Sequence, residues 1–182
     1  MAMSTLTTLA GIVEFAVPVL FASIGENITE KAGLINLSVN GTIILSAMGG
    51  FVVALTTSSL LLGFLMGALI GAAVAAIVAY SSITLKQSQV AIGFVLALLC
   101  RDLAYFLGAP FTNKPGDFLS KVPIPVLSDI PVIGPIFFNH SLVVYASYIF
   151  IIVVYVFMFK TRPGLMLQGI GERPAAAFVR GA

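Results

Sequence analysis

The chain alternates long uncharged apolar stretches with short polar segments. A membrane-spanning helix needs about 20 predominantly apolar residues, and five stretches are long enough. We predict spans at Leu6–Ile24, Leu34–Thr56, Leu60–Tyr80, Val90–Leu107 and Leu142–Phe159. The pattern therefore predicts an all-α fold, a polytopic transmembrane helical bundle.

The second stretch has an unusual entrance. A simple membrane anchor would carry leucines at this entrance, whereas this chain has Asn36, Ser38 and Asn40. Each polar group without a hydrogen-bond partner in lipid costs several kcal/mol. We therefore expect these residues to have a functional role. We interpret the segment as a broken or polar-lined helix of the kind from which transporters build permeation paths.

The segment between the fourth and fifth stretches is rich in proline. Prolines at 110, 115, 123, 125, 131 and 135 exclude a regular transmembrane helix here. The part from Val122 to Phe138 is nevertheless apolar. It is a partly re-entrant loop, an interfacial loop or a cap over the mouth of a path, and the sequence leaves these alternatives open.

The third stretch carries a packing pattern. Gly63, Gly67 and Gly71 repeat every four residues, and Ala75 and Ala79 continue the row. Small residues at this spacing form one helix face and let another backbone approach closely. We interpret this face as a helix–helix contact.

Composition agrees with a membrane protein. Hydrophobic residues make up 59% of the chain and charged residues 9%, against about 25% charged in an ordinary soluble domain. The net charge of +2 comes from basic residues near span ends, which excludes a nucleic-acid-binding patch. Lysine and arginine after the fifth span mark that end as cytoplasmic, so the 25–33 loop is internal and the N-terminus external.

Three charges fall inside predicted spans, namely Glu14, Arg101 and Asp102. Intramembrane charges are rare and usually face a bundle interior or water. Glu14 has the sign and depth to pair with Arg101, whereas Arg101 and Asp102 could equally reach the outer interface along their own helix. These charges also support an alternative function, an ion-coupled secondary transporter.

The last segment contains several helix breakers. Pro163-Gly164 and Gly169-Ile170-Gly171 are expected to divide it into short pieces, and Arg173-Pro174 to open a short alanine-rich helix. Such a helix suits docking into a groove of another protein, although a simple connector is the alternative.

Two of these segments together resemble the integral membrane permease of ATP-binding-cassette importers for branched-chain amino acids, simple sugars and nucleosides. The first carries Gly25-Glu26, Glu30-Lys31-Ala32-Gly33 and Asn36-Leu37-Ser38-Val39-Asn40-Gly41. The second carries Thr161-Arg162-Pro163-Gly164 and Gly171-Glu172-Arg173-Pro174-Ala175-Ala176-Ala177. The chain departs from the family pattern at Asn40, and at Gln168 and Gly169 where a basic residue and alanine are usual.

The resemblance implies a permease subunit, most similar to the nucleoside and simple-sugar types. It implies that Asn36, Ser38, Asn40 and Gly41 line the substrate path, and that residues 160–182 form a cytoplasmic coupling segment. Within that segment the residues expected to contact the ATPase are Gly171, Glu172, Arg173, Pro174, Ala175, Ala176 and Ala177. The substrate would be a nucleoside or simple sugar.

The implied partners are a cytoplasmic ATP-binding subunit, a second permease subunit, an extracellular solute-binding protein and the lipid bilayer of the cell membrane. The sequence has no phosphate-binding loop of its own, so we expect ATP hydrolysis in a partner and neither cofactor nor metal. A membrane enzyme is the third alternative, without a residue cluster to support it. Because such permeases have more spans than five, we expect residues 1–182 to be one permease domain that represents the N-terminal part of a larger fold.

Overall fold

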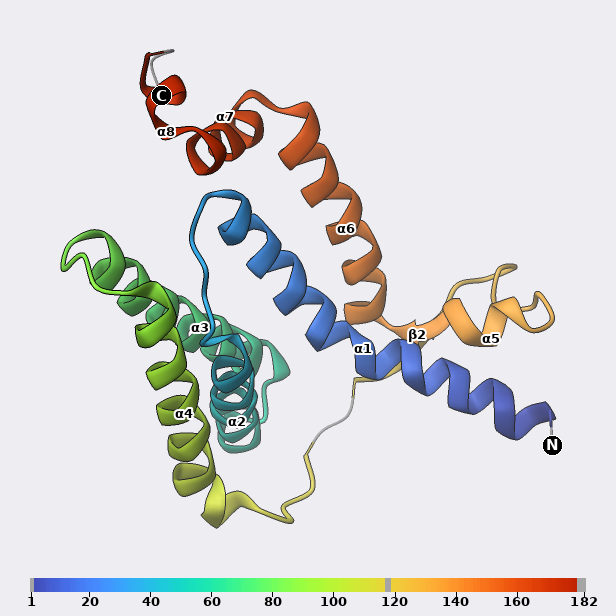
Figure 1. The fold of residues 1–182 in the computed structure, drawn as a ribbon. Coiled ribbons are helices and arrows are strands. Elements are labelled where there is room, and N and C mark those ends of the chain that lie inside the picture. The colour runs from blue at the N-terminus through green and yellow to red at the C-terminus, as the bar shows by residue number, and fades with distance from the viewer. Residues whose placement is uncertain (1, 117–118, 180–182) are drawn as a thin grey trace. The chain divides into compact units, whose positions relative to one another are not determined.

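The computed structural model describes residues 2–116 and 119–179, and these are mostly helical. Among them, five helices are long and apolar enough to cross a membrane (Figure 1). They are α1 (Ala2–Lys31), α2 (Val39–Thr57), α3 (Leu60–Ile83), α4 (Gln89–Gly108) and α6 (Leu142–Lys160). The predicted all-α polytopic fold is confirmed. Four of these helices cover a predicted span completely, and α2 covers the predicted second span from Val39 on.

The chain divides into two compact units. The first comprises the described residues of Met1–Ile28 and Phe118–Ala182, and the second those of Thr29–Asp117. The first unit therefore holds nearly all of α1 with the C-terminal third of the chain. The second holds the last turn of α1, then α2, α3, α4 and a 3-10 turn η1 (Ala109–Phe111).

In the second unit, α2 packs against both α3 and α4. A small apolar core joins the three helices. It is built from Val74 and Val78 of α3 with Leu96 and Cys100 of α4, and Leu45 of α2 packs against it. Cys100 therefore serves as a small buried apolar side chain.

The glycine row of α3 lies against α2. A Cβ atom added to Gly63 would lie 2.7 Å from the Gly50 carbonyl oxygen, and one added to Gly67 would lie 3.3 Å from the Ser46 carbonyl oxygen. Further along, a Cβ on Gly71 would make an ordinary contact, 3.8 Å from Ser46 Oγ. The absence of side chains at the first two positions thus permits the close approach of these two backbones.

The first unit contains α1, α6 and the elements between and after them. These are β1 (Lys121–Pro123), α5 (Ile133–Phe137), β2 (Asn139–Ser141), α7 (Arg162–Glu172) and α8 (Pro174–Val179). The two short strands pair antiparallel, with Lys121 opposite Ser141. The rings of Phe21 on α1 and Phe150 on α6 contact each other, with 5.2 Å between their centroids.

The predicted 25–33 loop is wrong. Helix α1 continues through this segment to Lys31. Residues 32–38, of which only Asn36 and Ser38 are polar, then lead to α2, which begins at Val39 rather than at Leu34. Hydropathy finds only the apolar part of a helix, whereas Glu26 and Glu30 are good helix formers in a polar setting. Gly33 follows the helix at φ 85°, the left-handed conformation in which glycine is favoured.

The predicted division of the tail at Pro163-Gly164 and Gly169-Gly171 is also wrong, because α7 is one helix from Arg162 to Glu172. Pro163 lies in the first turn, where a backbone N–H has no intrahelical partner to lose. The expected break at Arg173, before the alanine-rich helix α8, is present.

The proline-rich segment forms no membrane-spanning helix in the part of the chain that the structure describes, as predicted. It contains instead η1, the two short strands and the single turn of α5. Whether it lies in the membrane interface or caps a path stays a prediction.

Candidate functional site

The segment from Ile35 to Gly41, which we name the entrance segment, folds around its own hydrogen bonds. The Asn36 side-chain oxygen accepts from the Ser38 backbone N–H at 3.0 Å and from the Ser38 hydroxyl at 2.6 Å. Thr42 Oγ1 in turn donates to the Ser38 carbonyl oxygen at 2.9 Å. This is an Asx turn, in which an asparagine side chain takes the place of a backbone acceptor. It satisfies polar groups just before α2 begins.

One face of α4 supports the entrance segment. The Ile35 N–H donates to Gln89 Oε1 at 3.0 Å, and a Cβ on Gly93 would lie only 2.8 Å from the Leu37 nitrogen. One turn further along α4, Ala97 presents its carbonyl directly against Gly41. Residues 89, 93 and 97 follow the four-residue spacing that places side chains on one helix face.

This supporting face was not predicted from the sequence. Its signal, a polar residue followed by small residues at intervals of four, resembles the glycine row of α3. The contact joins positions more than 50 residues apart, however, and a periodic pattern on one helix does not identify its partner.

The four predicted path residues are neighbours in the chain but differ in exposure. Ser38 has 0% of its surface exposed and Gly41 is also buried, whereas Asn36 is half-buried and Asn40 is exposed. A solute cannot reach the Ser38 hydroxyl in this conformation. Asn40 is therefore the path residue whose side chain is best placed to contact a solute.

The charges predicted within spans have ion-pair partners. Glu14 Oε2 lies 3.8 Å from Lys121 Nζ, and Arg101 Nε donates to Asp102 Oδ1 at 3.0 Å. All four side chains are at least 37% exposed, so neither pair is buried within the described part of the chain. The suggested pairing of Glu14 with Arg101 stays a prediction. Among the described residues, no group of three or more His, Cys, Asp or Glu could hold a metal ion.

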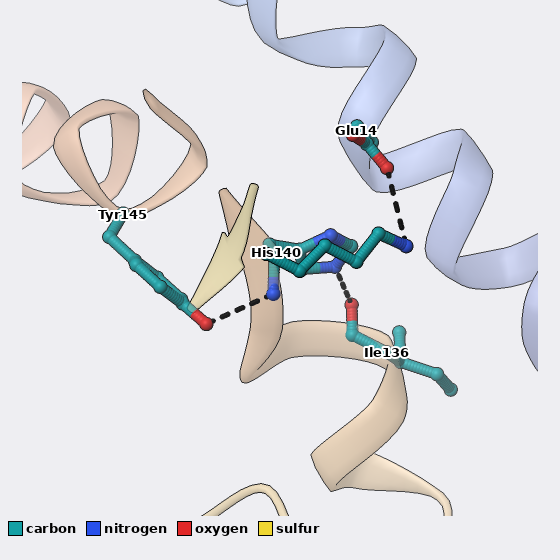
Figure 2. Close-up of polar contacts among 5 residues, drawn as sticks. Glu14, Ile136, His140 and Tyr145 are labelled. Atoms are coloured by element: carbon teal, nitrogen blue, oxygen red, sulfur yellow. Dashed lines mark hydrogen bonds and ion pairs between the residues drawn. The ribbon is translucent and has the colours of Figure 1, made fainter. Parts of the chain in front are cut away.

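The loop that contains β1 and β2 is fastened to α6 by Tyr145. Its hydroxyl accepts from the His140 backbone N–H at 3.0 Å and donates to the Val122 carbonyl at 2.9 Å, so that it bridges both strands. Figure 2 shows His140 between Tyr145 and Ile136, whose carbonyl oxygen lies 2.7 Å from His140 Nε2. His140 is fully buried. The loop is thus an ordered element at the start of α6.

The tail is fixed to the end of α6. Thr161 Oγ1 donates to the Phe157 carbonyl at 2.6 Å and accepts from the Gly164 N–H at 3.3 Å, which caps α7. Gly164 also packs directly against the Phe157 carbonyl, where a Cβ would collide. From the next turn, Gln168 Nε2 donates to the Met158 carbonyl at 2.6 Å. The last carbonyls of α6, which lack intrahelical partners, are thereby bonded to α7.

The predicted coupling residues lie beyond this junction. Gly171 and Glu172 end α7, Arg173 lies between the two helices, and Pro174–Ala177 form the first part of α8. The side chains of Ala175 and Ala176 are exposed, and so are those of Phe178 and Val179. Residues 180–182 of the predicted coupling segment lie outside the described residues.

Comparison with known proteins gives a consistent result. Residues 8–182 match the family described as the permease component of branched-chain amino acid transport systems. A Haloferax volcanii protein provisionally named as a glucose ABC transporter permease is 34% identical over 173 residues, which are 93% of this chain and 53% of the relative. No solved structure gave a significant match.

Two bacterial relatives show a similar level of likeness. The nucleoside ABC transporter permease of Lactococcus lactis subsp. cremoris is 32% identical, over 92% of this chain and 56% of its own length. The guanosine ABC transporter permease of Bacillus subtilis is 29% identical, with the same coverage of both chains. The chain spans about half the length of the curated relatives it matches.

Proposed function

Because the chain belongs to the family of permease components of branched-chain amino acid transport systems, we propose that it is a membrane-spanning permease subunit of an ABC importer. Its solute would be small and polar, a nucleoside or a simple sugar. The observation that carries this proposal is that the likeness to named nucleoside and glucose permeases runs over more than 90% of the chain. The five apolar helices support it.

The entrance segment would form part of the solute path. Asn40, which is exposed on the first turn of α2, would offer its amide to the solute. Asn36 and Ser38 would shape the path without direct contact, since they bond to each other. Gly41 would set the distance between α2 and α4, because it has no side chain to separate them. Of these four residues, Asn40 would thus contact the solute, and the other three would have structural roles.

The tail would receive the motion of an ATPase. A force applied to α8 would pass to α7 through Arg173, the residue between the two helices. From α7 it would pass to α6, because Thr161 and Gln168 are hydrogen-bonded to the last carbonyls of α6. The exposed alanines of α8 would dock into a groove of the ATPase.

Three protein partners follow from this function. ATP hydrolysis would take place in a cytoplasmic subunit, and the permease itself would catalyse no reaction. A second permease subunit, identical or different, would complete the path, and an extracellular solute-binding protein would deliver the solute. The family match favours this importer over the secondary transporter that Glu14, Arg101 and Asp102 suggested, and each of those charges has a partner in the chain.

The energy source of uptake tests the proposal. Cells that express the complete transport system would be given labelled guanosine or glucose, and either ATP or the ion gradient would be removed. We expect uptake to stop on ATP depletion and to continue after an ionophore collapses the gradient. Uptake that continues without ATP and stops with the ionophore would overturn the proposal in favour of the secondary transporter.

A further inference from the structure

A groove lies between α1 and α6 in the first unit, and none of the residues predicted for the solute path lines it. It has a volume of about 310 Å³ and is lined by Leu20, Ser23, Ile24 and Asn27 of α1 and by Val154 of α6. Small-molecule sites in proteins commonly measure about 300–1,000 Å³. The groove is therefore large enough to hold one sugar ring or part of a nucleoside.

The polar side chains of the groove face the same way. Ser23 and Asn27 are one helical turn apart, a spacing that places both on one face of α1, and both are exposed. A serine hydroxyl and an asparagine amide each donate and accept hydrogen bonds. Hydroxyl groups of a ligand need partners of this dual kind, because they too donate and accept.

The remaining walls are apolar. Leu20, Ile24 and Val154 would contact the carbon face of a ring, while the two polar groups contact its hydroxyls. Next to the groove, α1 and α6 are joined by the contact between Phe21 and Phe150. Aromatic pairs of this type are favourable beyond the area they bury, so the contact helps to fix the spacing of the two helices beside the groove.

From these observations we infer that the groove is a solute-binding subsite for a hydroxyl-bearing ring, either the ribose of a nucleoside or a hexose. This inference rests on the proposed function. The groove would contact the solute in addition to the contact proposed for Asn40, and it is built from residues for which the sequence predicted no role. The entrance segment differs because its Asn36 and Ser38 already satisfy each other.

Cysteine accessibility can test the subsite, because the chain has a single cysteine, the buried Cys100. In a Cys100→Ala background, Ser23→Cys and Asn27→Cys would be made separately in the complete importer. Each would be exposed to a small cationic methanethiosulfonate reagent with and without guanosine or glucose. We expect both cysteines to react. Solute at ten times its dissociation constant, which fills about 90% of the sites, should slow the reaction about tenfold.

Gly25→Cys provides the matched control. Residue 25 lies between the two test positions on α1, on the opposite helix face, and a Cβ added there meets no atom within 4 Å. Its reaction rate should be the same with and without solute. Protection by guanosine alone would assign the subsite to nucleosides, and protection by glucose alone would assign it to hexoses.

Two results would overturn the subsite while leaving the proposed function intact. Cysteines at 23 and 27 that do not react, in an assembly that still takes up solute, would show that another helix or lipid fills the groove. Cysteines that react at a rate independent of solute would show an open groove without a ligand. If the unmodified assembly itself has no ATP-dependent uptake of either solute, the proposed function fails and the subsite with it.

Discussion

The entrance segment and the groove between α1 and α6 contain the same kinds of polar residue but use them differently. In the entrance segment, Asn36 accepts two hydrogen bonds from Ser38, whose side chain is fully buried. In the groove, Ser23 and Asn27 are exposed beside apolar walls. An asparagine near a serine can thus build a turn or receive a ligand, and the residue types alone do not decide between these uses.

The contacts that hold the two regions in place also differ. The entrance segment is held by α4 through Gln89, Gly93 and Ala97, with backbone atoms at close range. The groove is bordered by a contact between two aromatic rings. Substitutions in the entrance segment should therefore mainly lower stability, and substitutions in the groove should mainly lower solute affinity.

The largest effect is expected at Gly41. A leucine there would place its Cβ against the Ala97 backbone, and the helices α2 and α4 would have to separate. Overpacking of this kind commonly costs about 1–3 kcal/mol, and more where only backbone could move. We expect almost no folded subunit from Gly41→Leu by size-exclusion chromatography in detergent. Gly25→Leu, where the structure leaves open space, should give a normal yield, and equal yields would contradict the close approach.

Asn36→Ala should have the next largest effect. It removes the acceptor of two hydrogen bonds and leaves the buried Ser38 hydroxyl without that partner. An unsatisfied buried group costs about 1–3 kcal/mol. The free energy of unfolding, measured by denaturant titration, should fall by that amount. Asn27→Ala in the groove is the control and should leave it unchanged, because Asn27 is exposed. A fully stable Asn36→Ala that loses uptake would make Asn36 a solute ligand.

Asn40→Leu should reduce solute uptake and leave the free energy of unfolding unchanged. The side chain is exposed, so its loss leaves no buried polar group. One lost hydrogen bond of about 0.5–1.5 kcal/mol corresponds to a reduction of uptake at low solute concentration of up to about tenfold. Initial uptake rates, corrected for the amount of subunit in the membrane, would measure it. An unchanged rate would show that solute does not contact the entrance segment at this residue.

Gln89→Ala should have the smallest effect. It removes the acceptor for the Ile35 N–H, but this bond is exposed and water can replace it. We expect the free energy of unfolding to fall by less than about 1 kcal/mol. Gln89→Glu keeps an acceptor oxygen and should restore most of the difference. A loss as large as that of Asn36→Ala would show that support from α4 matters as much as the turn itself.

The sequence predicted the spans better than their ends. All five spans could be found because a stretch of about 20 predominantly apolar residues is the length that a membrane-spanning helix requires. The continuation of α1 to Lys31 could not be found in this way, because its last turns carry Glu26, Glu30 and other polar residues. The unbroken α7 was missed because Pro163 and Gly164 break a helix in its interior but not in its first turn.

The candidate site was predictable only in part. The polar entrance of α2 stands out in the sequence, since asparagine is costly at the start of a membrane span. Its internal hydrogen bonds, its contact with Gln89 and the groove beside Val154 all depend on tertiary contacts. Ser23 and Asn27 appear in the sequence as two ordinary polar residues near the end of a span, and only their position opposite α6 distinguishes them.

The proposed role as an importer subunit is tested most directly by ATP hydrolysis in the complete assembly reconstituted into lipid vesicles. The rate would be measured with the solute-binding protein, with and without guanosine or glucose, and both with an imposed ion gradient and after an ionophore has collapsed it. The account predicts that one of these solutes raises the rate of ATP hydrolysis and enters the vesicles while ATP is hydrolysed. Solute entry that requires an ion gradient and leaves ATP hydrolysis unchanged would contradict it.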